Sequence, residues 1–260
     1  MRLLKLAAAT AVLATLLAGG AVGDEMRPVR IGTEGAYPPF NSIDPSGKLI
    51  GFDIEIADAL CAAAKFKCEF IIQDWDGMIP ALQANKFDAI IASMSVTAKR
   101  KEVVDFTGKY YSSPAKFIGA EGTEFDFTQG SGLVGKTIGV QGSTIHEDFA
   151  RAKWPQAEVV TYATQDEANA DLASGRLDLV MANGVALLDG FLKTPEGQGF
   201  VFVGDDYRDP DFHGEGAGIA IRKGEQELVD AFNAAIKQIR ADGTYKAIND
   251  KYFDFDIYGD

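Results

Sequence analysis

The chain has 260 residues and a formal net charge of −13, and 47% of its residues are hydrophobic. This length and composition are typical of a globular protein that buries a sizeable core. The negative charge argues against nucleic acids and anionic membrane surfaces as partners, because both repel an acidic protein.

The N-terminus has the pattern of a secretory signal peptide. Arg2 and Lys5 give a basic start, residues 6–17 are apolar, and a small-residue cleavage site precedes Asp24. The apolar stretch is short for a membrane span, and no later segment is apolar enough to form one. We therefore expect an exported, soluble product whose net charge is −15 once Arg2 and Lys5 are removed.

Apolar runs alternate with helical patterns along the rest of the chain. Buried strands are expected at residues 29–33, 70–73, 89–92, 137–140, 159–162, 179–182 and 219–222. Asp53 is expected to cap a helix with Ile56 and Leu60 on its apolar face, and residues 225–240 form a second amphipathic pattern. Such alternation predicts the α/β class, with mainly parallel sheets flanked by helices.

The loop after the first predicted strand, residues 34–40, carries an acidic and an aromatic side chain beside two prolines. The prolines stiffen the loop and restrict Tyr37. Tyr37 and Trp75 are candidate aromatic plates for a cationic group, with Glu34 as its charge partner. The alternative is that both rings pack loops against the core, which is the commoner fate of aromatic side chains.

Cys61 and Cys68 are the two cysteines of the chain. Along a continuous helix their Cα atoms would lie about 10.5 Å apart, whereas a disulfide needs less than roughly 7 Å. If they pair, the helix must end between them, near residues 65–66. Two cysteines without matching histidines make a poor zinc site, and we expect neither a metal nor another cofactor.

The run from Ser93 to Arg100 follows a predicted strand and combines hydroxyl groups, a turn and an arginine. Arginine presents a rigid fork of donors that fits a carboxylate bidentately. Ser93, Ser95 and backbone N–H groups could complete an anion site the size of an amino acid carboxylate. The alternative is a solvated surface arginine.

An internal repeat joins two parts of the chain. Residues 76–92 resemble residues 166–182 at a constant offset of 90, and residues 31–34 resemble residues 138–141. Each part reads as a helix, a turn and a buried strand. The repeat favours two related α/β lobes over a chance similarity of two βα units.

Polar residues stand at matched strand ends of the two lobes. Glu34 corresponds to Gln141, and Ser93 corresponds to Asn183. Ligands of open α/β sheets bind beyond the carboxyl ends of strands. These four side chains are therefore expected to face one another across a gap that holds a small molecule.

Ser143 and Thr144 stand at the expected start of a helix in the second lobe. They either meet a ligand carboxylate from that side or serve as an ordinary helix cap. His146 and His213 are far apart in the sequence and lack the spacing of metal ligands, so we expect both to be solvated surface residues.

Several of these motifs in combination make the chain similar to the periplasmic binding proteins of polar amino acid ABC importers. The motifs are residues 34–40, 50–53, 61 and 68, 75–80, 93–100, 141–144 and 252–259. The branch that it resembles binds lysine, arginine, ornithine or histidine. The resemblance implies two lobes joined by two hinge strands near residues 112–116 and 205–212. The implied division is a signal peptide at 1–23, a first lobe at 24–112, a second lobe at 113–208 and a return segment at 209–260.

The resemblance also implies the mode of action. A monomer in the periplasm would close on its amino acid ligand and dock on an inner-membrane permease. Arg100, Ser95 and Thr144 would hold the α-carboxylate of the ligand, and Ser93 would help with its α-amino group. The cysteine pair would form a disulfide that is common in the family.

At the other end of the ligand, Tyr37 and Trp75 would enclose the side chain, and Glu34 would pair with its distal cation. One departure concerns Asn183, because the family usually has an aspartate there that pairs with the α-ammonium. An asparagine supplies no negative charge, and a buried ammonium without its counter-ion is costly.

Alternative functions follow from this departure and from the fold. An opine or another N-substituted amino acid is one alternative ligand, and a guanidino compound or polyamine is another. A ligand without a carboxylate would leave Arg100 unused. An enzyme similar to cyclohexadienyl dehydratases would need a positioned carboxyl acid, for which Glu34 is the candidate. A soluble partner of a sensory receptor is the third class.

Overall fold

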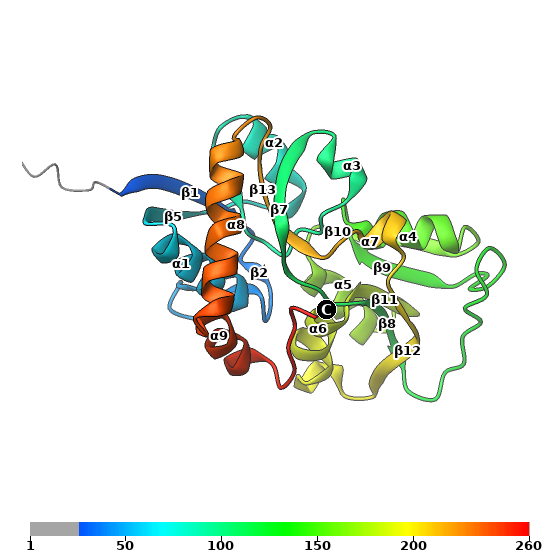
Figure 1. Cartoon of the computed structure of the whole chain (residues 1–260). Helices are drawn as coiled ribbons and strands as arrows, with labels where there is room; N and C mark the ends of the chain where they lie inside the picture. The colour runs from blue at the N-terminus through cyan, green and yellow to red at the C-terminus, as the bar shows by residue number, and fades with distance from the viewer. Residues whose placement is uncertain (1–25, 260) are drawn as a thin grey trace, which may run out of the picture.

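The computed structural model describes residues 26–259, so the expected signal peptide lies outside the described residues. Two α/β lobes lie side by side, each built on its own five-stranded sheet (Figure 1). No helix within residues 26–259 is both long and apolar enough to cross a membrane. The α/β class predicted from the sequence is confirmed.

The first lobe draws its sheet from both ends of the described chain, in the order β5-β1-β6-β13-β7. Its strands are β1 (Arg27–Thr33), β5 (Phe66–Ile72), β6 (Ala89–Ile90), β7 (Val104–Tyr111) and β13 (Ala217–Arg222). Only β13 runs against the common direction. The helices of this lobe are α1 (Phe52–Ala63), α2 (Met78–Gln83), α3 (Ala98–Lys101), α8 (Gln226–Ala241), α9 (Thr244–Tyr252) and the 3₁₀ turn η1 (Trp75–Gly77). A small antiparallel sheet comprises β2 (Ala36–Tyr37), β3 (Asn41–Ile43) and β4 (Leu49–Ile50).

The second lobe repeats this arrangement, with the order β10-β9-β11-β8-β12. Its strands are β8 (Ala115–Ala120), β9 (Thr137–Gln141), β10 (Glu158–Tyr162), β11 (Leu179–Asn183) and β12 (Phe200–Tyr207). Here β8 is the strand that runs against the others. The helical segments are α4 (Ile145–Lys153), α5 (Gln165–Ala173), α6 (Gly184–Leu187), η2 (Leu188–Leu192), η3 (Pro195–Gly197) and α7 (Pro210–His213).

The sequence repeat corresponds to a structural repeat. In the first sheet Ile31 pairs with Ala89, and in the second Ile138 pairs with Leu179, which are the positions that the repeat matches. The matched aspartates have the same role. Asp88 accepts the N–H of Arg30, and Asp178 accepts the N–H of Thr137, both at 2.9 Å.

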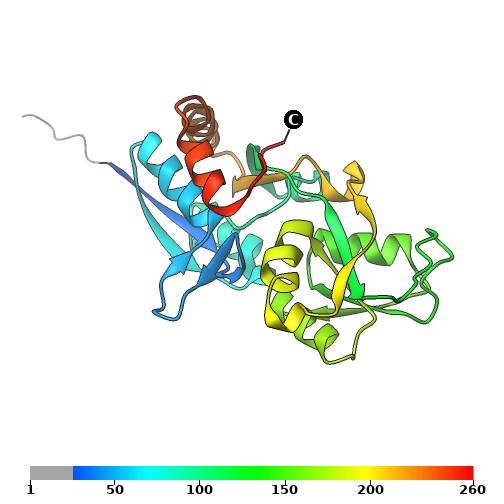
Figure 2. The same ribbon diagram turned by 90° about the horizontal axis from the view of Figure 1, so that it is seen from below.

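The chain passes between the two sheets twice. It leaves β7 and enters β8 through residues 112–114, and it returns from β12 to β13 through residues 208–216. Tyr207 pairs with Ala115, so the two crossings lie side by side (Figure 2). The crossings fall where hinges are expected, and the exact lobe boundaries stay a prediction.

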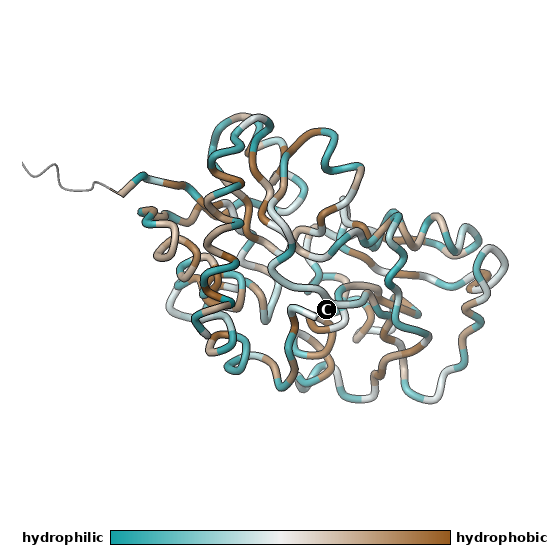
Figure 3. The backbone as a smooth tube through the Cα atoms, in the orientation of Figure 1, coloured by the Kyte–Doolittle hydropathy of each residue, from teal (hydrophilic) through white to brown (hydrophobic). Residues whose placement is uncertain are grey.

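The first lobe has one core cluster between its sheet and two helices, α1 and α8, and a second beneath α2. The hydrophobic residues of α8 point inward, and Phe232 and Ile236 pack in one cluster with Ile56 and Leu60 of α1. Figure 3 shows the same separation, with brown segments along the strands and on single faces of the helices. The predicted Cys61–Cys68 disulfide is confirmed, with a Cα–Cα distance of 6.1 Å.

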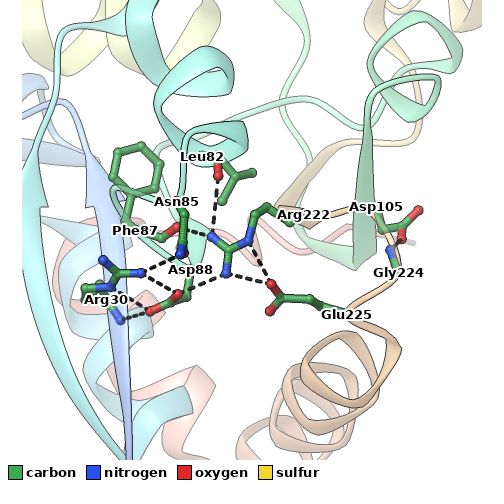
Figure 4. Close-up of polar contacts among 9 residues, drawn as sticks. All are labelled: Arg30, Leu82, Asn85, Phe87, Asp88, Asp105, Arg222, Gly224 and Glu225. Atoms are coloured by element: carbon green, nitrogen blue, oxygen red, sulfur yellow. Dashed lines mark hydrogen bonds and ion pairs between the residues drawn. The ribbon is translucent and has the colours of Figure 1, made fainter.

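An ionic cluster in the first lobe links Arg30 of β1 and Arg222 of β13 to Asp88, the residue before β6 (Figure 4). The Asp88 carboxylate accepts hydrogen bonds from Arg30 of β1 at 2.9 and 3.0 Å and from Arg222 of β13 at 3.0 Å. Arg222 also pairs with Glu225 at the start of α8. Burial alone would raise the pKa of Asp88, but the two arginines outweigh burial and hold this pKa well below its usual range.

Replacing Asp88 by asparagine is expected to destabilise the protein by about 2–3 kcal/mol at neutral pH, because two guanidinium groups lose their shared carboxylate. A lowered carboxyl pKa stabilises the fold above the unfolded pKa and loses its effect as the pH falls. The difference from the unaltered protein should therefore shrink below about pH 4. Urea unfolding at pH 7 and pH 3 measures both effects.

Asp178→Asn is the matched control, because Asp178 occupies the equivalent position but pairs with a single lysine, Lys136. It should cost about 1 kcal/mol. Equal losses for the two variants would contradict the role given to the paired arginines.

Candidate functional site

The two lobes enclose a cavity of about 290 Å³ at the carboxyl ends of the parallel strands. Eight of the nine predicted ligand-binding residues line it: Glu34, Tyr37, Trp75, Ser93, Ser95, Arg100, Thr144 and Asn183. Ser143 is the exception. It is exposed, and its carbonyl accepts a hydrogen bond from Trp75 Nε1 at 3.2 Å. The structure thus brings eight of the predicted residues to one cavity. Their roles in ligand binding stay predictions.

Arg100 carries a partly buried positive charge at the cavity wall. Its guanidinium donates to the carbonyl of Ser95 at 3.1 Å and lies over the Trp75 ring, 5.3 Å from the centroid. Within residues 26–259 no carboxylate forms an ion pair with it, and Asp148, the acid that acts on its pKa, is paired with Lys99. Burial lowers the pKa of Arg100 to about 10. A buried charge without a partner is unfavourable, so the site favours an anionic ligand group.

In the segment before Arg100, Ser93 has a left-handed backbone with φ of 56°, and burial alternates over residues 93–96. Met94 and Val96 are buried in the protein, which turns Ser93 and Ser95 towards the cavity. Thr97 then caps α3, because its hydroxyl accepts the N–H of Arg100 at 3.3 Å. Local burial and capping therefore fix the two serines and the arginine on one wall.

The Asp53 carboxylate accepts a hydrogen bond from Ser93 of this wall, a contact that was not predicted from the sequence. Gly51 is the residue at the N-cap of α1, and Asp53 makes no capping hydrogen bond, so the predicted cap is wrong. The buried Asp53 carboxylate instead accepts from Ser93 Oγ at 2.9 Å, from Asn41 at 2.9 Å and from Tyr110 at 2.8 Å. Burial raises the pKa of Asp53 to about 6, although these hydrogen bonds oppose the shift.

Glu34 lies at the far side of the cavity and joins the lobes. Its Oε1 accepts a hydrogen bond from Gln141 Nε2 at 2.6 Å, so these two matched strand ends meet directly. Glu34 is only 7% exposed. Burial raises its pKa to about 7, and the hydrogen bond from Gln141 opposes the shift while the charges of Asp166 and Asp74 add to it.

Tyr37 and Trp75, the two candidate aromatic side chains, contact different residues. The Tyr37 hydroxyl accepts the N–H of Asn183 at 3.4 Å, and its ring lies 6.0 Å from that of Phe40. Trp75 is in contact with Arg100. Tyr37 thus lies near Asn183 of the second lobe, whereas Trp75 lies beside the arginine.

Thr144 and Asn183 of the second lobe both line the cavity and cap a helix. The Thr144 hydroxyl accepts the N–H of Glu147 at 3.3 Å and donates to the carbonyl of Gln141 at 2.7 Å. Asn183 Oδ1 accepts the N–H of Val185 at 2.9 Å, and its Nδ2 donates to the Tyr111 hydroxyl at 3.4 Å. Thr144 therefore serves as the helix cap of α4, which was one of its two expected roles. The Asn183 side chain carries an N–H donor, whereas an aspartate would offer acceptors only.

The expectation of solvated histidines is wrong. His146 in the first turn of α4 is 8% exposed, and His213 at the end of α7 faces it with ring centroids 6.2 Å apart. Both line the cavity. Burial lowers the pKa of His146 to about 3 and also lowers that of His213. The packing of α7 against α4 brings the two rings together, and no local sequence pattern indicates that contact.

The raised pKa values of Glu34 and Asp53 predict how stability changes with pH. The folded protein holds these two protons more tightly than the unfolded chain does, with pKa values of about 7 and about 6. As the pH falls from about 8 to about 5, these two groups should together stabilise the ligand-free protein by about 2–4 kcal/mol, whereas the lowered pKa values of His146 and His213 act in the opposite direction over the same range. Urea unfolding of the protein and of Glu34→Gln across this range isolates the contribution of Glu34, because both proteins have the same histidines. The stability of the variant relative to the unaltered protein should fall by about 2 kcal/mol between pH 8 and pH 5. Parallel pH profiles of the two proteins would contradict the assignment.

The family model, two curated relatives and a solved structure that match this chain all represent solute-binding proteins. Residues 29–255 match the model of the bacterial extracellular solute-binding proteins, family 3. The chain is 51% identical to an L-arginine-binding protein of Pseudomonas aeruginosa over 235 residues, 90% of each chain. It is 44% identical to the lysine/arginine/ornithine-binding periplasmic protein of Escherichia coli, over 89% of this chain and 90% of the relative. A Salmonella typhimurium periplasmic binding protein described as having high arginine specificity superposes with a TM-score of 0.80 at 32% identity, covering 87% of this chain and 99% of the other.

Proposed function

The chain belongs to family 3 of the bacterial extracellular solute-binding proteins, and from that premise we propose that it binds a basic amino acid and delivers it to an ABC importer. Relatives named for arginine, or for lysine, arginine and ornithine, support this ligand class. The proposed setting is the periplasm, reached with the signal peptide at residues 1–23. The proposed partner is an inner-membrane permease, which a monomer would dock on after closure.

The observation that carries the proposal is the charge arrangement of the cavity. Arg100 presents a partly buried cation without a carboxylate partner among the described residues, and Glu34 presents a buried carboxyl group whose described partner is the neutral Gln141. A basic amino acid complements both, with its α-carboxylate at Arg100 and its distal cation at Glu34. Binding of such a cation would also keep Glu34 ionised at neutral pH.

We propose binding without turnover as the activity. Curated relatives and solved neighbours are binding proteins. The buried carboxyl of Glu34 is the group that a dehydratase would need, but its partner Gln141 and the aromatic Tyr37 suit the recognition of a cation equally well. The absence of any conversion of arogenate or prephenate on incubation is the expected result.

Titration calorimetry of the ligand-stripped protein tests the ligand class. The panel is arginine, lysine, ornithine and histidine, with glutamine and agmatine as controls that lack the distal cation or the carboxylate. At least one basic amino acid should bind about a hundredfold more tightly than either control, because each control loses one charge-assisted contact. Equal binding of agmatine and arginine, or no binding of any basic amino acid, would overturn the proposal.

A further inference from the structure

The α-ammonium group of a bound amino acid finds no free acceptor on Asn183. The Oδ1 atom of Asn183 already accepts the N–H groups of Val185 and Ala186, at 2.9 and 3.4 Å, and thereby caps α6. Its Nδ2 atom donates to the Tyr111 hydroxyl at 3.4 Å. The side chain is therefore fully engaged, and it carries no charge that could balance an ammonium.

The carboxylates that line the cavity are committed elsewhere. Among residues 26–259 they are Glu34 and Glu215. Glu34 lies where the distal cation of the ligand is proposed to bind, and Glu215 pairs with Lys101 at 2.7 Å. A buried ammonium without a counter-charge is costly. Such a counter-charge can therefore come only from behind the cavity wall.

Asp53 of α1 is a fully buried carboxylate directly behind Ser93. Its side chain is 0% exposed, and it accepts from Ser93 Oγ at 2.9 Å, from Asn41 Nδ2 at 2.9 Å and from the Tyr110 hydroxyl at 2.8 Å. All three donors are neutral, and no lysine or arginine of residues 26–259 acts on its pKa. Burial raises this pKa to about 6, so the carboxylate is largely ionised at pH 7. Asp53 thus holds a negative charge that no cation of the described chain balances.

Ser93 connects this carboxylate with the cavity. Its backbone is left-handed, with φ of 56°, and its N–H donates to the Tyr110 hydroxyl at 3.0 Å. The Ser93 hydroxyl has a single proton, which it donates to Asp53, and two lone pairs. The Tyr111 hydroxyl, which also contacts Ser93, occupies one lone pair at most. At least one lone pair of Ser93 Oγ is therefore available to an N–H donor in the cavity.

The direction of these hydrogen bonds decides what Ser93 recognises. Because its proton is held by Asp53, the Ser93 hydroxyl acts as an acceptor towards the cavity and favours an ammonium group. Two hydrogen bonds in series place the Asp53 carboxylate about 5 Å from the ammonium nitrogen. Opposite charges at that distance attract more strongly in a buried setting than in water, since the effective dielectric constant is lower.

We propose that Asp53 is a positioning residue that supplies, through the Ser93 hydroxyl, the counter-charge for the α-ammonium of the ligand. Asp53 does not touch the ligand. It fixes the proton of Ser93 and provides the negative charge that Asn183 lacks, and it thereby selects α-amino acids over the same molecules without the amino group. This inference rests on the proposed function, because it uses the same ligand class in the same cavity.

Calorimetry with two matched pairs of probes tests this role. The pairs are arginine with 5-guanidinopentanoic acid and lysine with 6-aminohexanoic acid, and the second member of each pair lacks only the α-amino group. Asp53→Asn removes the charge and keeps the shape, because its amide oxygen can accept from Ser93 and Asn41 while its NH₂ group can donate to the Tyr110 hydroxyl. Asp58→Asn is the matched control, since Asp58 is an exposed aspartate of the same helix. Circular dichroism and the melting temperature report whether each variant folds.

Asp53→Asn should weaken the binding of arginine and lysine by about thirtyfold, with the two probes that lack the amino group changed by no more than about threefold. Asp58→Asn should affect neither member of a pair. Adding Asn183→Asp to Asp53→Asn should restore at least about fivefold of the lost affinity, because a carboxylate then faces the ammonium from the second lobe. Asn183→Asp alone should improve arginine binding by no more than about threefold, because Asp53 already supplies the counter-charge.

Equal weakening of both members of a pair by Asp53→Asn would show that Asp53 only shapes the wall, and it would overturn the inference. Unchanged arginine binding in that variant would overturn it too. A gain of about tenfold or more from Asn183→Asp alone would show that the ammonium lacks a counter-charge in the unaltered protein, a result that does not require Asp53→Asn to fold. These outcomes leave the proposed function standing. If no basic amino acid binds the unaltered protein, the proposed function fails as well.

Discussion

Arg100→Met is expected to weaken the binding of arginine by about a thousandfold. In the proposed complex the guanidinium of Arg100 is the cation that holds the α-carboxylate of the ligand, and removing one partner of a buried ion pair costs about 3–5 kcal/mol. Methionine fills a similar length without charge. The ligand-free protein should be no less stable than before, because the substitution removes a partly buried charge that lacks an ion-pair partner among residues 26–259.

Lys99→Met is the control for this prediction. Lys99 precedes Arg100 in α3, but it is exposed and pairs with Asp148 at the surface. Its loss should change the affinity for arginine by no more than about twofold. Calorimetry and thermal unfolding of both variants give the comparison. Unchanged affinity in Arg100→Met would show that the α-carboxylate is held elsewhere.

Glu34→Gln is expected to change selectivity rather than abolish binding. The amide has the shape of the carboxylate but loses its charge, so the affinity for arginine and lysine should fall about a hundredfold. A neutral amino acid such as glutamine does not depend on that charge and should keep or improve its weak binding. The ratio of arginine to glutamine affinity, measured by competition against a fluorescent or radiolabelled ligand, is the diagnostic quantity.

Asp166→Asn provides the matched carboxylate control. Asp166 raises the pKa of Glu34 through its charge but does not line the cavity. The variant should leave the arginine to glutamine ratio within about threefold of its starting value. If Glu34→Gln behaves in the same way as Asp166→Asn, the distal cation does not lie at Glu34.

The parts of the fold that could be predicted from the sequence are those with a local pattern. Buried strands such as β9 and β11 are mostly apolar, and the two internal repeats matched the end of β9 to that of β1 and the end of β11 to that of β6. Glu34 and Gln141 were expected to face each other on this ground alone, and they are in hydrogen-bond contact.

Strands at and near the crossings escaped prediction because their sequences do not look buried. The sequence of β7 is VDFTGKYY and that of β12 is FVFVGDDY, and both mix charged residues and glycine with apolar ones. Strand β8, with the sequence AKFIGA, lies between β11 and β12 and pairs with both. Such strands are stabilised by long-range pairing, which a local pattern does not encode.

Site residues that depend on long-range contacts were missed for the same reason. Asp53 looked like a helix cap, but its contact with Ser93 lies 40 residues away in sequence. The contact between His146 and His213 arises from the packing of α7 on α4. Residue type and spacing can identify a group that acts at a strand end, but they cannot identify a group that acts through a distant partner.

A crystal structure of the protein with arginine tests the central claim most directly. The account predicts a closed cleft in which the α-carboxylate of arginine lies within hydrogen-bond distance of the Arg100 guanidinium, while its own guanidinium reaches the Glu34 carboxylate beside Tyr37. A ligand bound in the reverse orientation, or one that leaves Arg100 or Glu34 without contact, would contradict the account.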